Sequence, residues 1–248
     1  MMKIEAKKLE TFCSVVSALV QECHLTITKD GLTTRAVDAA NVAMVQVLLP
    51  NTAFTEFTIE PGVIGMDVAK WKQALGVMKP DAVIAIDRPK EGRITMSDGG
   101  YDYKLTPLDP NTIRKQPNVP TFNLPNALTV DGKEFAEAIK ALAVIGDKAR
   151  LTIRGATLEL STEGDTDFLK KEIPGEPMTG KKNETAAASL FSLDYLREIT
   201  KGASGMKGAE KIAISLGIDH PVRFDFDIGE LSGSYVIAPR IETDGGAE

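Results

Sequence analysis

The sequence predicts an α+β protein made of two tandem, pseudo-repeated domains with antiparallel sheets. The segments 25–28 (Leu-Thr-Ile-Thr) and 151–154 (Leu-Thr-Ile-Arg) stand 126 positions apart, and each follows a helical segment with an apolar stripe. A second matching pair, 84–87 and 212–215, stands 128 positions apart. This period is far longer than that of a solenoid repeat. Short turns join most of the expected strands, which is typical of antiparallel sheets.

The first half reads as two helices among short strands. Between residues 7 and 22 apolar side chains recur at steps of three and four, which predicts an amphipathic helix. Thr11, Ser14 and Ser17 are expected on its solvated face, and a second helix is expected over 67–78. The Lys29-Asp30-Gly31 segment is a hairpin signal. The expected strands are 3–6, 25–28, 32–37, 43–49, 82–87, 93–97 and 101–106.

Four prolines between residues 108 and 127 separate the two halves. Proline at this density continues neither a helix nor a central strand, so we expect a linker at 109–127 between domains at 1–108 and 128–242. The acidic, glycine-rich residues 243–248 are expected to be a disordered tail. The second domain repeats the pattern of the first, with helices expected at 132–145 and 193–201 and strands at 151–153, 157–161, 168–173, 187–190, 211–216, 222–227 and 233–238.

The composition is that of an ordinary soluble protein, with 43% hydrophobic and 26% charged residues and a net charge of −6. No apolar run approaches the roughly 18 residues of a membrane span, and the start lacks a signal-peptide pattern. We therefore expect a cytoplasmic, nucleoid-associated protein, or a nuclear one in a eukaryote, without a membrane partner. Cys13 and Cys23 stand ten residues apart in one expected helix, too far to bridge, and are expected to be buried free thiols.

The sequence lacks the patterns that catalysis requires. Its two histidines, His24 and His220, have no ligands at metal-binding spacing, and no Walker A, GxGxxG or GxSxG motif occurs. The glycine-rich segment 202–208 follows a helix instead of leading from a strand into one, so a flexible helix exit is expected. Asp225 and Asp227 alternate with phenylalanines, as on the solvated face of a strand. We expect no catalytic residue, no metal and no cofactor.

Three segments carry a resemblance to a known family over the whole chain: GLTTRAVDAANVAMV at 31–45, Ile-Gly-Asp at 145–147 and YVIAPRIE at 235–242. In order and spacing they resemble the sliding clamps of the proliferating-cell-nuclear-antigen type, closest to the archaeal version. The resemblance implies a non-enzymatic DNA polymerase processivity factor. It further implies a head-to-tail homotrimer around duplex DNA, with helices inside and sheets outside. The implied partners are DNA polymerase, a clamp loader of the replication factor C type, flap endonuclease and DNA ligase.

The resemblance also implies that an edge strand of the first domain pairs with an edge strand of the neighbouring subunit's second domain. The matching segments are 100–106 and 167–173. Each would leave backbone groups unpaired in a monomer, which is a physical reason for assembly. The competing interpretation is that both strands are internal. The expected interface residues are Tyr101, Tyr103, Lys104, Phe168, Lys170 and Lys171.

Local charge fits the implied ring. The helical segments 7–22, 67–79, 133–148 and 194–207 sum to +3, so the rest of the chain carries −9. This separation suits a mildly basic bore that contacts phosphates diffusely, and an acidic exterior. The first helix departs from the family because it offers small polar residues where lysines are frequent. The DNA-facing candidates are Lys70, Lys72, Lys140, Lys148, Lys201 and Lys207.

A second implied surface is an apolar pocket beneath the linker that holds a short partner peptide, with the C-terminal strand adding backbone pairing. Carried over residue by residue, the pocket comprises Val37, Asn41, Val42, Met44, Val119, Pro221, Val236, Ala238 and Pro239. The alternative hypothesis is a two-domain α+β enzyme or ligand-binding protein with a site between the halves. In that case Asp38 or Asp225 would be essential for turnover.

Overall fold

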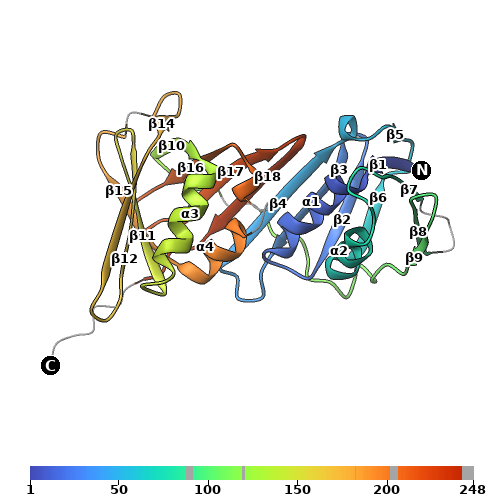
Figure 1. The fold of residues 1–248 in the computed structure, drawn as a ribbon, viewed down its shortest axis with the longest axis horizontal. Helices are drawn as coiled ribbons and strands as arrows, with labels where there is room; N and C mark the ends of the chain where they lie inside the picture. The colour runs from blue at the N-terminus through green and yellow to red at the C-terminus, as the bar shows by residue number, and fades with distance from the viewer. Residues whose placement is uncertain (88–91, 119–120, 182, 202–205, 242–248) are drawn as a thin grey trace.

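The computed structural model describes residues 1–87, 92–118, 121–181, 183–201 and 206–241. Within these ranges the chain forms four α-helices and three sheets whose named strands pair antiparallel throughout, which confirms the predicted α+β class. Figure 1 shows the helices in the middle of the molecule, between one sheet at the left end and another at the right end. Val119 and the expected tail at 243–248 lie outside the described residues.

The helices pack in two pairs, α1 (Ala6–Ser17) with α2 (Val68–Gly76) and α3 (Gly132–Leu142) with α4 (Leu193–Thr200). Each helix buries an apolar stripe against the sheets. Two of them begin with an aspartate whose side chain accepts a backbone N–H, from Lys70 to Asp67 at 3.0 Å and from Glu134 to Asp131 at 2.7 Å. Such caps satisfy donors that the first helical turn leaves unpaired.

Helix α1 is shorter than the predicted 7–22. It ends at Ser17, because Leu19 and Val20 pack against the core from a turn and Cys23 already belongs to a strand. Their spacing fits a helix, but the chain uses these apolar side chains in other elements. Thr11, expected on the solvated face, is buried, and its Oγ1 donates to the Lys7 carbonyl at 2.9 Å.

The strands form three sheets. The five-stranded sheet has the order β5 (Glu56–Phe57), β1 (Met2–Glu5), β7 (Val83–Asp87), β8 (Ile94–Ser97), β9 (Asp102–Leu105). The nine-stranded sheet has the order β14 (Glu176–Pro177), β10 (Asn126–Asp131), β16 (Lys211–Leu216), β17 (Val222–Ile228), β18 (Leu231–Ile237), β4 (Ala43–Pro50), β3 (Gly31–Val37), β2 (Glu22–Thr28), β6 (Gly62–Asp67). The four-stranded sheet has the order β13 (Phe168–Pro174), β12 (Thr157–Glu163), β11 (Lys148–Arg154), β15 (Ala187–Ser192). Two short 3-10 helices, η1 (Asn51–Ala53) and η2 (Met206–Gly208), are the remaining elements of the described residues.

A strand, a helix and three strands recur four times along the chain. The copies are β1-α1-β2-β3-β4, β6-α2-β7-β8-β9, β10-α3-β11-β12-β13 and β15-α4-β16-β17-β18. Each half therefore contains two copies, and in each half the two copies exchange their first strands: β1 joins the sheet of β7 to β9, and β6 joins that of β2 to β4. The repeat found in the sequence is a duplication of a unit that is itself doubled.

One continuous sheet joins the two halves, because β4 of the first half pairs with β18 of the second. The register runs from Ala43 opposite Ile237 to Leu48 opposite Ser232. On the helix side of this joint Val45 and Tyr235 are fully buried, and the Tyr235 hydroxyl donates to the Val15 carbonyl of α1 at 2.7 Å. The sequence pattern did not predict this joint.

The linker crosses the face of the nine-stranded sheet that points away from the helices. Ile113 is buried near Gly65 of β6, and Gln116 donates to the Thr26 hydroxyl of β2 at 3.2 Å. Farther along, Leu124 is buried, and β10 begins at Asn126. The last two residues of the expected linker, 126 and 127, therefore belong to a strand.

Candidate functional surfaces

A basic groove lies between α3 and α4. It is a hollow of about 280 Å³ lined by Ala136, Glu137, Lys140, Arg197, Glu198, Thr200, Lys201 and Lys207. Three of the predicted lysines thus come together here, from the last turn of α3, the end of α4 and η2. Sequence reasoning missed Arg197, although it stands four residues before Lys201 on the same helical face. Four cations face two carboxylates, so the formal charge of the lining is +2.

The other predicted lysines lie elsewhere. Lys70 is exposed on α2 and pairs with Asp67 at 3.0 Å, while the Lys72 ammonium donates to the Ser17 hydroxyl of α1 at 3.2 Å. Lys148 begins strand β11, so its placement in a helical segment was wrong. The apolar pattern extended to residue 145, but α3 ends at residue 142 and a turn connects it to the strand.

The charge separation is smaller than predicted. Within the bounds that the structure gives, the net charge is +1 for α1, +2 for α2, 0 for α3 and −1 for α4. The helices therefore carry +2 and the rest of the chain −8, because several charged residues of both signs lie just beyond the helix ends. As predicted, the helices are net positive and the rest of the chain is net negative.

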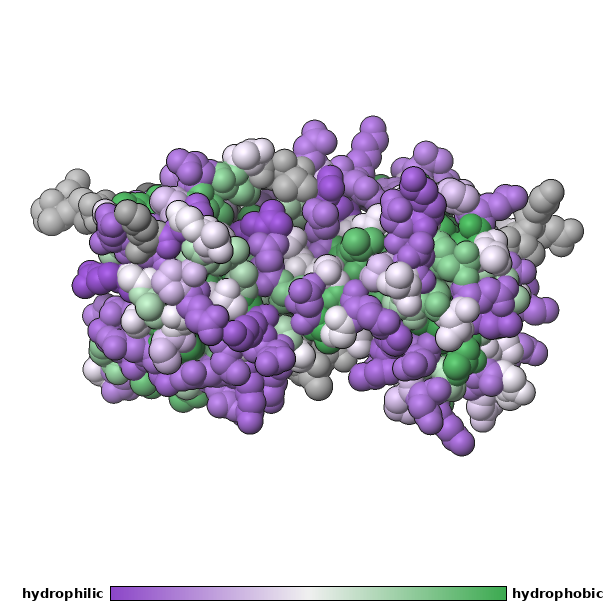
Figure 2. Space-filling model, turned by 90° about the horizontal axis from the view of Figure 1, so that it is seen from above, coloured by the Kyte–Doolittle hydropathy of each residue, from purple (hydrophilic) through white to green (hydrophobic). Residues whose placement is uncertain are grey.

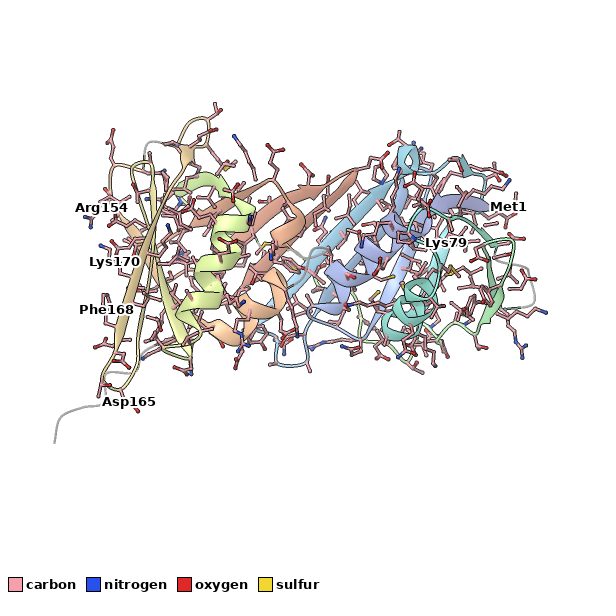
Figure 3. The ribbon with its side chains drawn as sticks, in the orientation of Figure 1. Met1, Lys79, Arg154, Asp165, Phe168 and Lys170 are labelled. Carbon is pink, nitrogen blue, oxygen red and sulfur yellow. The ribbon has the colours of Figure 1, made fainter. Side chains whose placement is uncertain are left out.

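Strands β9 and β13 are edge strands in the described part of the chain. Strand β9 pairs only with β8, and β13 pairs only with β12. They lie at opposite ends of the molecule: Figure 1 shows β9 at the right, and Figure 3 shows Phe168 and Lys170 of β13 at the left. Tyr101, just before β9, is 63% exposed and Phe168 is 64% exposed. Each end therefore combines unpaired backbone groups with an exposed aromatic ring, as at an assembly surface.

The charged side chains of the left end have partners within the chain. Lys170 lies 2.6 Å from Glu159 and 3.0 Å from Glu172. Lys171 points to the other side of β13 and pairs with Glu134 of α3 at 2.7 Å. At the right end Lys104 is exposed, while Tyr103 packs against the core.

Three of the predicted peptide-pocket residues lie side by side on the linker side of the nine-stranded sheet. Val37, Met44 and Val236 form a row across β3, β4 and β18. Met44 is 8% and Val236 is 7% exposed, and neither belongs to the main core. The Ala238 N–H donates to the Val42 carbonyl at 2.8 Å, which extends the pairing of β18 beyond the strand. Of the remaining predicted residues, Pro221 directly precedes β17, Pro239 follows Ala238 and Asn41 is exposed in the turn after β3.

Asp38 organises the turn between β3 and β4. Its Oδ1 accepts the Val42 and Ala43 N–H groups, both at 2.8 Å, and its Oδ2 accepts the Ala40 N–H at 3.1 Å. The Tyr195 hydroxyl of α4 donates to Oδ2 at 2.6 Å. Burial acts to raise the pKa of Asp38, but these donors outweigh it and hold the pKa below its usual value.

Two further residues, both missed from the sequence, fix this turn. Burial, followed by the hydrogen bond to Asp38 and the charge of its carboxylate, raises the pKa of Tyr195 to about 12. From the linker, Arg114 donates to the Asp38 carbonyl at 2.6 Å and also to the Asn41 side-chain oxygen. The spacing of Asp38 before a short turn was a usable signal, because aspartate often binds the backbone N–H groups that follow it. Nothing local in the sequence points to Tyr195, which is 157 residues away.

The residues considered for catalysis have structural roles. Asp225 is bound by Arg223, whose Nε and Nη2 donate at 2.6–3.0 Å. His24 bonds the Pro110 carbonyl at 2.8 Å, and His220 bonds the Ile218 carbonyl at 2.6 Å. Among the described residues no group of three or more His, Cys, Asp or Glu side chains is arranged to hold a metal ion.

The surface is mainly polar. In Figure 2 hydrophilic residues cover most of the face seen from above, and hydrophobic residues appear in separate small patches. Of the helices in the described ranges, none has the length and apolar character of a membrane span.

Comparisons with known proteins agree with this geometry. Residues 4–95 match the family model of the proliferating cell nuclear antigen N-terminal domain, and residues 118–241 match that of its C-terminal domain. DNA polymerase sliding clamps of Methanoculleus marisnigri and Methanoregula boonei are 43% and 42% identical over 246 residues, covering 97% of this chain and 98% of each relative.

A solved structure is similar over nearly the whole chain. It is described as the C-terminal region of FEN-1 bound to A. fulgidus PCNA, and it covers 98% of this chain and 100% of its own at 29% identity and a TM-score of 0.86. The two family models together span most of the sequence, and the relatives exceed 40% identity along its length. The chain therefore belongs to the proliferating cell nuclear antigen family, and it is a DNA polymerase sliding clamp.

Proposed function

We propose that three copies of this chain close head to tail into a ring around duplex DNA, and that the ring tethers replication enzymes without catalysing a reaction. The observation that carries the proposal is the β4–β18 joint. In the repeat, β13 holds the place of β4 and β9 holds the place of β18. The two edge strands are therefore the counterparts of two strands that already pair. Because they lie at opposite ends of one molecule, only a second copy can bring them together.

The internal joint also supplies the register of the proposed one. Tyr103 corresponds to Tyr235, because each pairs with the equivalent residue of the preceding strand, Met96 or Phe224. The pairing of β2 with β3 matches that of β11 with β12, and the pairing of β3 with β4 matches that of β12 with β13. Through these pairings Leu169 corresponds to Val45. Since Val45 pairs with Tyr235, we expect Tyr103 opposite Leu169 of the partner subunit.

This register brings opposite charges together. Asp102 would face Lys170 of the partner subunit, and Lys104 would face Phe168 of the partner subunit. An opposite-charge pair directly across an antiparallel ladder contributes roughly 0.2–1 kcal/mol. Its larger effect is on specificity, since a slip by one residue would turn every side chain to the other face.

Three chains joined in this way would place twelve helices around one opening. The groove between α3 and α4 would then present Lys140, Arg197, Lys201 and Lys207 to the duplex, with Lys70 and Lys72 on the other helix pair. A lining of only +2 per groove supports weak, sequence-independent phosphate contact, which permits sliding.

The row of Val37, Met44 and Val236 is the proposed dock for partner peptides. In the similar A. fulgidus structure the bound partner is the C-terminal region of FEN-1. An apolar row beside a strand end that already bonds backbone at Ala238 suits a peptide with an apolar anchor that adds as a strand. DNA polymerase, a clamp loader, flap endonuclease and DNA ligase are the proposed partners.

The test is cross-linking at the expected register. The double variant Asp102→Cys, Lys170→Cys is oxidised and its mass is measured, with the double variant Lys104→Cys, Glu172→Cys as a matched control. The control residues lie on the same faces of the same strands but about four residues out of register, or roughly 13 Å. We expect covalent trimers from the first variant only, and stimulation of a cognate polymerase on primed circular DNA by the native chain. A chain that is monomeric at micromolar concentration and stimulates no polymerase would refute the ring.

A further inference from the structure

We propose that Tyr195 of α4 is a positioning residue of the peptide dock, and that its hydroxyl holds the 38–43 turn in the shape that receives a partner. The inference rests on the proposed function, because the dock itself is part of that proposal. Tyr195 does not belong to the row that would touch the peptide. It acts through Asp38, at the other end of a 2.6 Å hydrogen bond.

The Asp38 carboxylate is saturated by four donors. Three are backbone N–H groups of its own turn, and the fourth is the Tyr195 hydroxyl. Two carboxylate oxygens accept about four hydrogen bonds in all, so no capacity remains unused. Removing the hydroxyl leaves one lone pair of a buried charged group without its partner, so the carboxylate must regain a donor through movement of the turn or entry of water.

The turn has other support as well, because the Asp38 N–H donates to the Ala43 carbonyl at 2.9 Å and the Asn41 N–H donates to the Asp38 carbonyl at 3.2 Å. Asn41 at its tip adopts φ of 59°, in the left-handed region, which asparagine enters more readily than most residues other than glycine. From the linker, Arg114 binds the Asp38 carbonyl and the Asn41 side chain. The turn carries Val42 and leads directly into Met44, so any movement of Asp38 shifts one wall of the dock.

Helix α4 faces both proposed surfaces. Arg197 and Lys201 line the basic groove, whereas Tyr195 reaches the turn of the other half. Tyr195 and Arg197 are two residues apart, so they project about 200° apart around the helix axis.

The chain offers a matched control for the test. Tyr195→Phe and Tyr235→Phe each delete one hydroxyl that bonds the first half from the second, at 2.6 and 2.7 Å. Tyr235 binds the Val15 carbonyl of α1 on the helix side of the sheet, the face opposite the proposed dock, so its variant reports the cost of losing such a bond without removing a donor from the turn. The probe is a synthetic peptide with the sequence of the A. fulgidus FEN-1 C-terminal region.

We expect Tyr195→Phe to raise the Kd of this peptide about three- to tenfold, since binding would then have to order the turn that the hydroxyl no longer holds. Amide exchange should accelerate at Ala40, Val42 and Ala43, while the trimer mass stays the same. Tyr235→Phe should lower the melting temperature but leave both the Kd and these amides as in the native chain.

The outcomes separate the two proposals. If the native chain does not bind the peptide, the proposed dock fails and Tyr195 has no dock to position. If the native chain binds it and Tyr195→Phe binds equally well, with unchanged exchange in the turn, the dock stands and the positioning role is wrong. An equal loss of affinity in both tyrosine variants would also overturn it, because the effect would then follow general destabilisation.

Discussion

Neutralising two lysines of the basic groove should weaken DNA binding, and the number of lysines removed sets the expected change in its salt dependence. The variant is Lys140→Gln with Lys201→Gln, which lowers the formal charge of the groove from +2 to 0. Lys201 is 73% exposed and pairs with Glu198 at 3.3 Å. Such an exposed pair contributes at most about 1 kcal/mol, so a phosphate can replace the carboxylate, and losing the pair costs little stability.

The salt dependence of binding gives the magnitude. Each phosphate that a lysine neutralises contributes about 0.9 to the slope of log K against log salt concentration. Two lysines in each of three subunits would lower the slope by about 5 if all six contact DNA at once. If the duplex contacts the lysines of one subunit at a time, the slope is lowered by about 2.

The assay is fluorescence anisotropy of a labelled duplex at several salt concentrations. The matched control is Lys29→Gln with Lys211→Gln, which changes the net charge equally at a hairpin turn and at a residue paired with Glu176. The control should lower the slope by less than about 1, and both variants should remain trimers. Equal slopes for the two variants would refute the assignment of the groove to DNA.

Three more outcomes are expected. Replacing Met44 or Pro239 with Glu should abolish peptide binding in a calorimetric titration while the ring mass stays unchanged, because a charge would enter the predicted apolar pocket. Retained affinity would place the dock elsewhere. Folding lowers the pKa of Asp38, so the stabilisation that its ionised carboxylate gives to the turn is fully present above the pKa of the unfolded chain. This stabilisation is lost as the pH falls through the pKa of the folded chain. Peptide affinity should therefore stay constant near neutrality and fall only below about pH 4. Burial raises the pKa of both the Cys13 and Cys23 thiols, so neither should react with a thiol reagent at pH 8 until the chain unfolds, and rapid labelling of the native protein would contradict their burial.

The sequence predicted most elements of the fold because their signals are local. Apolar steps of three and four marked the four helices, and turn residues marked most strands. The error at α1 arose where Leu19, Val20 and Cys23 continued a helical spacing for other reasons. The repeat was recognised only at the level of the half-chain, because β6 and β10, the first strands of the second and third copies, were not among the expected strands. The exchange of first strands between neighbouring copies also leaves no local pattern.

The candidate surfaces likewise combine features that have local signals in the sequence with features that depend on contacts between distant segments. The lysines of α3 and α4 could be grouped by helical face, whereas their meeting with Lys207 depends on η2, which packs against both helices. The row of Val37, Met44 and Val236 came from the family resemblance, and its register across β18 needed the structure. The Asp38–Tyr195 bond joins residues 157 positions apart, and such a long-range contact leaves no trace in a single sequence.

A ring of this kind would contain two sorts of strand-to-strand joint, here called seams: the β4–β18 joint within each chain and the proposed β9–β13 joint between chains. Three of its six seams would be tethered within a chain, where the linker keeps the strands at a high effective concentration and a broken pairing reforms at once. The other three would hold only by contact between separate molecules, and there β9 offers four residues where β18 offers seven. Opening such a ring to admit DNA would therefore require the least free energy at a β9–β13 seam. The ring would open between two subunits, while the β4–β18 joint within each chain stays paired.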